Sequence, residues 1–261
     1  MHFVAMAIQL QHKDRSAPLT TADGPYAHAA VLHAISDQDA SLGRILHDAG
    51  RHKRMTLAIV RSDRWMAALR LAFMAQEGLL YANAIVNALS VRPVLQLAQT
   101  TCTVEGVDLV NPPWASISTW ADLQSHEVGR YMRFAFITPT AIMKQNSRGR
   151  RFSALFPESL DVFSGLEKRW RALQGPALPK DLAEFVRAGG CVASDFDLRA
   201  VKFTTRERTQ VGFLGWVVYE CRTGELAYIA ALNALTRLAF FTGVGYQTAR
   251  GMGAVKTAIS N

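Results

Sequence analysis

The chain of 261 residues is 49% hydrophobic, which is enough to bury the core of one large or two small domains. Lysine and arginine number 29 against 21 aspartate and glutamate, so the formal net charge is +8, with an isoelectric point near 9.7. This balance favours a polyanionic partner, either nucleic acid or an anionic membrane surface, although a basic soluble enzyme would also fit it.

The three cysteines, Cys102, Cys191 and Cys221, are far apart in the sequence and odd in number. No C-x-x-C pair occurs, so the sequence indicates neither a zinc cluster nor a disulfide framework, and a reducing cytoplasm is the expected compartment. The apolar residues 3–8 have no basic segment before them and are expected to form a first strand, not a signal peptide. Charged or polar residues interrupt the most apolar stretches, so we expect no membrane span and no membrane partner.

Hydrophobic patterns divide the first part of the chain into the order strand, helix, strand, strand, helix, strand. The expected elements are a strand at 2–11, helices at 26–35 and 40–48, strands at 55–60 and 65–75, a helix at 79–89, and one or two strands within 94–110. This βαββαβ order is that of the ferredoxin-like fold. We therefore predict a first domain over residues 1–112, followed by a Pro-rich, weakly periodic linker at 113–127.

The same order returns in residues 128–261, which we predict to be a second ferredoxin-like domain. Its expected elements are a strand at 128–138, a polar basic loop at 143–151, helices at 159–173 and 182–188, strands at 191–205 and 209–222, a helix from 223, and a last strand from 254. The predicted fold class is therefore α+β, with two tandem ferredoxin-like domains. The halves share no sequence repeat, so their similarity is one of pattern only.

The most distinctive stretch is residues 242–256, TGVGYQTARGMGAVK, in which two G-x-G pairs bracket a polar segment. Glycine adopts positive φ at little cost, and a turn of this kind can present backbone N–H groups to phosphates. A dinucleotide-binding loop is not indicated, because the order here is helix, loop, strand and no glycine lies three residues after Gly245. A Walker A loop is excluded because no G-K-[S/T] follows. A glycine-rich connection without a ligand is the alternative.

The string G-V-G-Y-x-T-x-x-G-M-G-x-V over residues 243–255 closely resembles the C-terminal glycine-rich signature of the CRISPR repeat-RNA processing endoribonucleases. These enzymes belong to the repeat-associated RNA-binding (RAMP) superfamily. Similar segments occur at 136–141, at 155–157 with 163–170, and at 46–48 ahead of Lys53, and the N-terminal part of the match is the less specific one. The resemblance implies two ferredoxin-like domains, repeat RNA as partner, and metal-independent cleavage without a cofactor.

Metal-independent RNA cleavage uses the 2′-hydroxyl of the RNA as nucleophile. It needs a base for that hydroxyl, an acid for the 5′-oxygen, and positive charge at the phosphate. Histidine suits both proton roles, and lysine or arginine suits the third. The resemblance assigns His47 as general acid/base and Lys53 as the cation that stabilises the phosphate. On the residues alone, a helix end followed by a solvated charge run at 51–54 is the stronger interpretation.

His33 is the second candidate catalytic residue. Members of the family often carry a tyrosine or another proton-transfer group on the first helix, and the corresponding segment here is Leu32-His33, so the resemblance points to His33 as the partner of His47. A partly buried packing histidine is an equal alternative. Metal binding by His28 and His33 is not expected, because five residues separate them and no further ligand joins them.

Basic residues cluster at three places that suit contacts with RNA phosphates. One is the predicted loop at 144–151, which has no acidic residue and suits an RNA stem, with a disordered solubilising loop as the alternative. The others are the segment after His47 and the glycine string; a lesser patch lies at 202–208. The predicted RNA-binding residues are Arg51, His52, Arg54, Lys144, Arg148, Arg150, Arg151, Gly243, Gly245, Gln247, Arg250, Gly251, Gly253 and Lys256.

The hypothesis that follows is a CRISPR-associated endoribonuclease that cuts precursor RNA within each repeat and leaves a 2′,3′-cyclic phosphate and a 5′-hydroxyl. A non-cleaving RNA-binding subunit of a CRISPR effector complex is the first alternative, since such a subunit would not need the histidines. The second is an unrelated basic protein that binds a nucleotide or phosphorylated small molecule through the glycine loop. The sequence leaves open whether the protein is a monomer or a homodimer.

Overall fold

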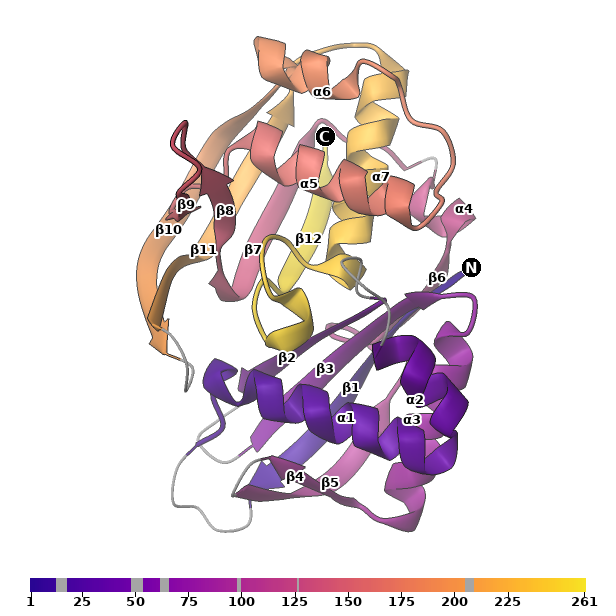
Figure 1. Cartoon of the computed structure of the whole chain (residues 1–261). Helices are drawn as coiled ribbons and strands as arrows, with labels where there is room; N and C mark the ends of the chain where they lie inside the picture. The colour runs from indigo at the N-terminus through magenta and orange to yellow at the C-terminus, as the bar shows by residue number, and fades with distance from the viewer. Residues whose placement is uncertain (13–17, 48–53, 62–65, 98–99, 126, 205–208) are drawn as a thin grey trace. The chain divides into compact units, whose positions relative to one another are not determined.

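The computed structural model describes residues 1–12, 18–47, 54–61, 66–97, 100–125, 127–204 and 209–261. Contacts divide the chain into two compact units (Figure 1). The first contains Met1–Thr119 and, from the far end of the chain, Gln247–Met252; the second contains Trp120–Tyr246 and Gly253–Asn261. The segment predicted as a linker, 113–127, carries the strand β6 (Ser116–Thr119) and the helical turn α4 (Trp120–Leu123).

The first unit is built on an antiparallel sheet with the strand order β2-β3-β1-β5-β4, and β6 also pairs with β1. Its strands are β1 (His2–His12), β2 (Met55–Arg61), β3 (Met66–Ala75), β4 (Val94–Leu97) and β5 (Thr100–Asp108). Its helices are η1 (Thr21–Asp23), α1 (Gly24–Gln38), α2 (Ala40–His47) and α3 (Gly78–Val91). Within the residues that the structure describes, the expected strand and helix positions of 2–110 are confirmed, with ends displaced by a few residues.

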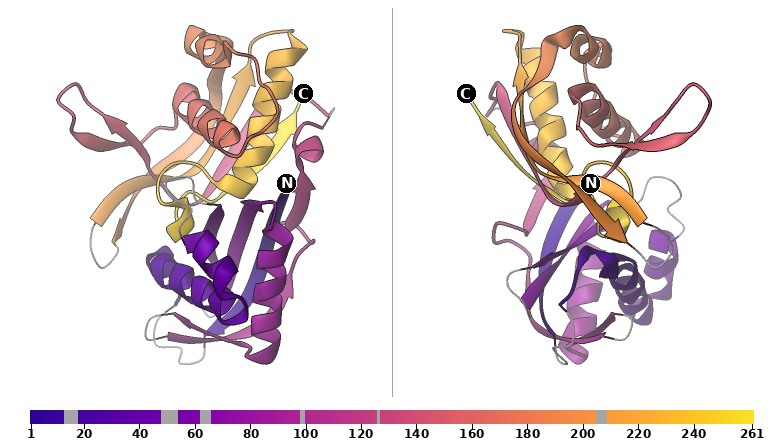
Figure 2. Two further views of the ribbon diagram at one scale, coloured as in Figure 1. Left: turned by 45° about the vertical axis from the view of Figure 1, so that its right-hand side comes forward. Right: turned by 90° about the vertical axis from the view of Figure 1, so that its left-hand side faces the viewer.

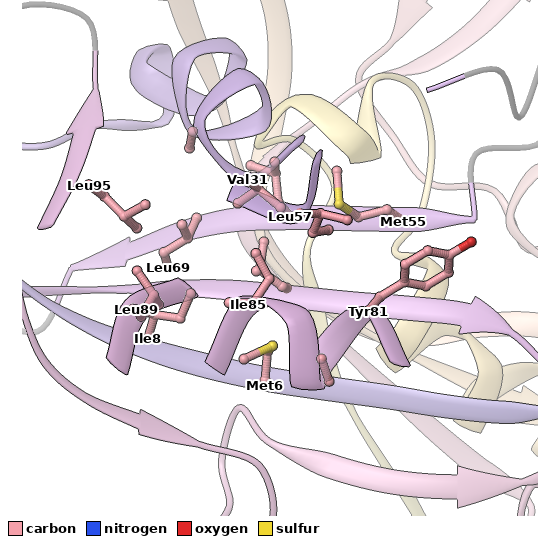
Figure 3. Packing of buried hydrophobic residues seen from close by; sticks show 14 of the residues in the cluster. Met6, Ile8, Val31, Met55, Leu57, Leu69, Tyr81, Ile85, Leu89 and Leu95 are labelled. Carbon is pink, nitrogen blue, oxygen red and sulfur yellow. The ribbon is translucent and has the colours of Figure 1, made fainter. Parts of the chain in front are cut away.

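Side chains from α1 and α3 pack against one face of this sheet (Figure 3). Alternate residues of a strand point to the same face, so Met6 and Ile8 of β1 enter this core together. The cluster also receives Val31 from α1, Leu57 from β2, Leu69 from β3, and Tyr81, Ile85 and Leu89 from α3, all of them buried. The apolar side chains of the two helices therefore cover this face of the sheet.

The second unit repeats the plan with the strand order β10-β11-β7-β12. Its strands are β7 (Tyr131–Thr140), β10 (Cys191–Thr204), β11 (Thr209–Cys221) and β12 (Val255–Ser260), and its helices are α5 (Ser159–Ala172), α6 (Leu182–Phe185), η2 (Val186–Gly190) and α7 (Leu226–Thr242). Aromatic rings fill its core. The ring of Phe134 lies 5.9 Å from that of Phe163 and 5.4 Å from that of Tyr219, centroid to centroid.

In both units the main strands, numbered along the chain, lie in the order 2-3-1-4, with a helix after the first and another after the third. This is the ferredoxin-like arrangement, so the predicted α+β class with two tandem domains is confirmed. Among the helices that the structure describes, none is long and apolar enough to cross a membrane.

The predicted basic loop at 143–151 is wrong, because these residues belong to a β-hairpin. Its strands are β8 (Ile142–Gln145) and β9 (Arg151–Ala154), and the crimson hairpin projects from the second unit in both views of Figure 2. The side-chain oxygen of Asn146 accepts hydrogen bonds from the N–H groups of Arg148 (3.0 Å) and Arg150 (2.9 Å) and so shapes the turn. An exposed two-stranded ribbon buries few apolar side chains, so no clear alternation marked it in the sequence.

Candidate functional site

His47 is the last residue of the short helix α2, and its side chain is exposed. The Asp39 carboxylate caps the start of this helix: it accepts hydrogen bonds from the Ser41 hydroxyl (2.6 Å) and from the N–H groups of Ser41 (2.8 Å) and Leu42 (3.2 Å). These bonds hold the pKa of Asp39 below its ordinary value. Leu46 is buried in the core, so it fixes the end of α2 while His47 faces solvent. The predicted site residues Arg51, His52 and Lys53 lie outside the described residues.

Arg54 lies immediately before β2, in the same unit as His47. Its carbonyl accepts a hydrogen bond from the Met74 N–H (2.8 Å), which holds the backbone of Arg54 against β3 where β2 begins. Its guanidinium Nη1 is 4.0 Å from the Glu77 Oε2, and the side chain is 47% exposed. An ion pair at this separation is weak, so most of the charge of Arg54 is available to an anion in solution.

His33 lies on α1 with its Nδ1 2.8 Å from the Oδ2 of Asp37, one turn later. Both side chains line an open groove of about 730 Å³ between α1, the end of α3 and β4, together with Tyr26, Arg92 and Gln96. His33 is 77% exposed, so the packing alternative is wrong. His47 is not among the described residues that line this groove. Asp37 was missed in the sequence, although its i,i+4 spacing from His33 was a usable signal.

The glycine string forms a closed loop at the end of α7. Its four glycines, Gly243, Gly245, Gly251 and Gly253, all have positive φ, as does Gln247 at 56°. The Val244 N–H donates to the Gly253 carbonyl (2.8 Å), the Gly253 N–H to Pro139 (3.1 Å) and the Tyr246 N–H to Ala141 (2.9 Å). These amides are engaged within the protein, and three of the glycines are buried. The glycines therefore shape the backbone of the loop.

Arg169 of α5 holds this loop from within the second unit. Its Nη1 donates to the carbonyls of Thr242 and Gly243 (2.8 Å to Gly243), and its Nη2 donates to the carbonyl of Gly245 (2.8 Å). Burial lowers the pKa of this guanidinium to about 10, so it stays charged at neutral pH. Sequence reasoning placed Arg169 inside a matched motif without giving it a role, because the loop that it binds is far away in the chain.

The middle of the loop belongs to the first unit. It contains the short helix η3 (Thr248–Arg250), which contacts β2 and α1. The Arg250 carbonyl lies against Gly24 so closely that a Cβ at Gly24 would be 2.1 Å from its oxygen. The Arg250 side chain itself is exposed. The structure therefore brings Arg250 into the unit that carries His47 and Arg54, which the sequence did not predict.

The predicted cations of the β8–β9 hairpin divide into two kinds. Lys144 is paired with the carboxylates of Asp161 (2.7 Å) and Glu158 (3.1 Å), and these bonds, above all that to Asp161, raise its pKa. Because the pKa is raised in the folded state, the pairing contributes stability at neutral pH and loses it only as pH rises above the ordinary lysine value. Arg148, Arg150 and Arg151 are exposed at and beside the turn.

The remaining predicted positions are spread over the second unit. Lys256 is half-buried in β12, opposite Ala135 of β7. Lys202 is exposed on β10, whereas residues 205–208 lie outside the described residues. Within the described ranges, no group of three or more His, Cys, Asp or Glu side chains is placed to hold a metal ion.

Comparison with known families and structures gives consistent matches. The family model described as CRISPR-associated endoribonuclease Cas6 matches residues 134–255. A Cas6 protein solved as a product complex is 24% identical, with a TM-score of 0.85 and coverage of 98% of this chain and 100% of that one. Thermus thermophilus Cas6 is 25% identical, with a TM-score of 0.76 and 98% coverage of both chains. Another Cas6 protein, solved as a substrate mimic complex, is 22% identical, with a TM-score of 0.76, over 99% of this chain and 100% of that one. Curated protein sequences give no significant match.

Proposed function

We propose that this chain, whose residues 134–255 match the Cas6 family model, is a CRISPR-associated endoribonuclease that cleaves precursor CRISPR RNA within the repeats by attack of the RNA's own 2′-hydroxyl. The observation that carries the proposal is the exposed His47 at the end of α2, in the unit that also presents Arg54 and Arg250. A unit that presents an imidazole and exposed cations has the kinds of group that this reaction needs.

In the proposed reaction, the 2′-oxygen forms a bond to the adjacent phosphorus while the bond from phosphorus to the 5′-oxygen breaks. A base takes the proton of the 2′-hydroxyl, and an acid gives a proton to the leaving 5′-oxygen. The products are a 2′,3′-cyclic phosphate and a 5′-hydroxyl. His47 takes one proton role, and Lys53 stabilises the negative charge of the phosphorane with help from neighbouring cations.

His33 is the proposed second proton-transfer group. Its support is the hydrogen bond between its Nδ1 and the Asp37 carboxylate, which favours the tautomer with the proton on Nδ1. Nε2 is then the nitrogen that can accept a proton from the RNA. The accessible groove in front of this pair gives a nucleotide room to approach.

We propose that the β8–β9 hairpin binds the repeat through Arg148, Arg150 and Arg151, which contact phosphates of an RNA stem. Their exposure on a projecting hairpin supports this role. In the glycine loop, Arg250 is the proposed phosphate contact, and the glycines set the backbone that presents it. A related RAMP protein has been solved binding different RNA substrates, with 15% identity and a TM-score of 0.62.

The direct test is a cleavage assay on the host's repeat RNA in excess EDTA, read on a denaturing gel. We expect one cut, and we expect His47→Ala to slow it by about 10²–10⁴-fold, the usual scale for a lost general acid or base. His33→Ala is expected to slow it as well if His33 is the second proton-transfer group. Lys180→Ala, an exposed cation outside the proposed site, is the matched control and should cleave normally.

A repeat with a 2′-deoxy substitution at the cleavage site is the second arm. It should bind with unchanged affinity and remain uncut, since its nucleophile is missing. Normal cleavage of this substrate would refute the proposed chemistry. Tight binding of the unmodified repeat by the wild type without any cut would instead favour the non-cleaving RNA-binding subunit.

A further inference from the structure

Cys191 and Cys221 face each other on neighbouring strands. Cys191 is the first residue of β10, Cys221 is the last residue of β11, and the antiparallel register pairs them directly. The Arg222 N–H donates to the Gly190 carbonyl (2.8 Å) immediately outside the pair. In an antiparallel ladder, a bond at this position shows that Cys191 and Cys221 form a non-hydrogen-bonded pair. The Cα atoms of such a pair are about 4.5 Å apart. The two side chains therefore leave the same face of the sheet at close range.

This geometry suits a disulfide bond. Cystine usually joins Cα atoms about 4.4–6.8 Å apart, and a pair of this kind falls inside that range without movement of the backbone. Both cysteines are free thiols and buried, at 0% and 1% exposure. Burial raises the pKa of both thiols, and for Cys191 the neighbouring Cys221 raises it further. The third cysteine, Cys102, lies in the other unit.

We propose that Cys191 and Cys221 are a covalent modification site, which closes to an intramolecular disulfide by exchange with a small-molecule disulfide such as oxidised glutathione. One cysteine thiolate attacks a glutathione sulfur, breaks the glutathione S–S bond and releases one glutathione thiolate. The other cysteine thiolate then attacks the protein sulfur of this mixed disulfide and releases the second glutathione. Two protein thiols lose two protons and two electrons, and one glutathione disulfide becomes two thiols.

Burial decides when this exchange takes place. Inside the closed unit both groups stay as thiols, which do not attack a disulfide. The reaction therefore begins when the ends of β10 and β11 separate, as they do during folding, and pairing of the strands then brings the second sulfur to the first. The disulfide would also hold in place two hydrogen bonds from this strand pair to neighbouring elements. The Cys191 carbonyl accepts from the Ser159 hydroxyl of α5 (2.7 Å), and the Cys221 N–H donates to the Arg130 carbonyl before β7 (2.8 Å).

The experiment is refolding of the denatured, full-length protein in a buffer of oxidised and reduced glutathione, with parallel refolding in a reducing agent. We expect the oxidised product to keep one free thiol of three, with the tryptic peptides 188–199 and 209–222 joined by a disulfide in the mass spectrum. We also expect its Tm to rise by about 5–10 °C over the reduced form, since the bridge restricts the unfolded chain.

Three variants serve as controls. Cys102→Ser should form the same bridge and lose its remaining free thiol, whereas Cys191→Ala and Cys221→Ala should each form no intramolecular bridge. Circular dichroism of each refolded variant shows whether it has folded. Three free thiols in the folded wild type after oxidative refolding, or bridges to Cys102 as frequent as the bridge between Cys191 and Cys221, would overturn the proposal.

Discussion

At the scale of single residues, Arg169 stabilises the glycine loop through several side-chain hydrogen bonds. One buried guanidinium serves three carbonyls of the loop that follows α7. A glycine-rich turn exposes carbonyl groups that no helix or sheet satisfies, and a buried acceptor without a donor costs free energy. The fork of five N–H donors on arginine can reach several of these oxygens at once, which a lysine cannot do with the same geometry.

We expect Arg169→Ala to lower the free energy of unfolding by about 2–4 kcal/mol, because it removes charge-assisted hydrogen bonds and leaves buried carbonyls unpaired. Chemical denaturation of the two proteins measures the difference. Lys168→Ala, an exposed substitution one residue earlier on α5, should change stability by no more than about 0.5 kcal/mol. Equal stability of Arg169→Ala and the wild type would show that the loop does not depend on this guanidinium.

At the scale of elements, the β8–β9 hairpin separates charges that hold the fold from charges that face solvent. Lys144 sits between two carboxylates of the α5 region, whereas Arg150 is exposed beside the turn. A cation whose charge is already neutralised by the protein releases few counterions from RNA, while a free cation releases them on binding. Substitution of Lys144 and substitution of Arg150 should therefore have different effects on the salt dependence of RNA binding, more than on the affinity at a single salt concentration.

Arg150→Ala is expected to weaken repeat-RNA binding and to reduce the slope of log affinity against log salt concentration by about 1. Lys144→Ala should leave that slope unchanged, because its loss affects the anchoring of the hairpin. Fluorescence anisotropy over a range of salt concentrations measures both. A reduced slope for Lys144→Ala with an unchanged slope for Arg150→Ala would reverse this assignment.

At the scale of the whole molecule, the chain returns to its first unit near its C-terminal end. The segment Gln247–Met252 packs with β2 and α1, although it lies between residues of the second unit in the sequence. Gly24 makes the close approach possible, because its missing side chain leaves room for the Arg250 carbonyl. The first unit is therefore complete only when the last part of the chain is present.

Gly24→Ala should disturb this packing, because the new Cβ would meet the Arg250 carbonyl at 2.1 Å. We expect a loss of stability of about 1–3 kcal/mol, typical of overpacking, and faster amide hydrogen exchange in residues 247–252. Gly106→Ala is the matched control, since a Cβ there has nothing within 4 Å. Unchanged exchange in 247–252 of the Gly24→Ala protein would contradict the close approach.

Some features were predictable from the sequence because their causes are local. The apolar run of β1 and the apolar residues of α7 each lie within one element, and both elements are largely buried. The β8–β9 hairpin was not predicted, because neighbouring residues such as Arg151 and Phe152 are both exposed and give no alternation of buried and exposed positions. The pairing of Asp37 with His33 could have been predicted from their i,i+4 spacing on one helix.

The order of the main strands and helices and the two ferredoxin-like domains were predictable from local sequence patterns, and the glycine string indicated the resemblance to the CRISPR repeat-RNA processing endoribonucleases. Hydrophobic periodicity and turn residues act over a few positions, so they can be read directly from the chain. Three features became visible in the folded chain alone: Arg169 binds the glycine loop, Gln247–Met252 packs in the first unit, and Cys191 lies opposite Cys221. Each of these contacts joins residues distant in sequence, and their proximity depends on how the elements pack together, which the periodicity within one element does not specify.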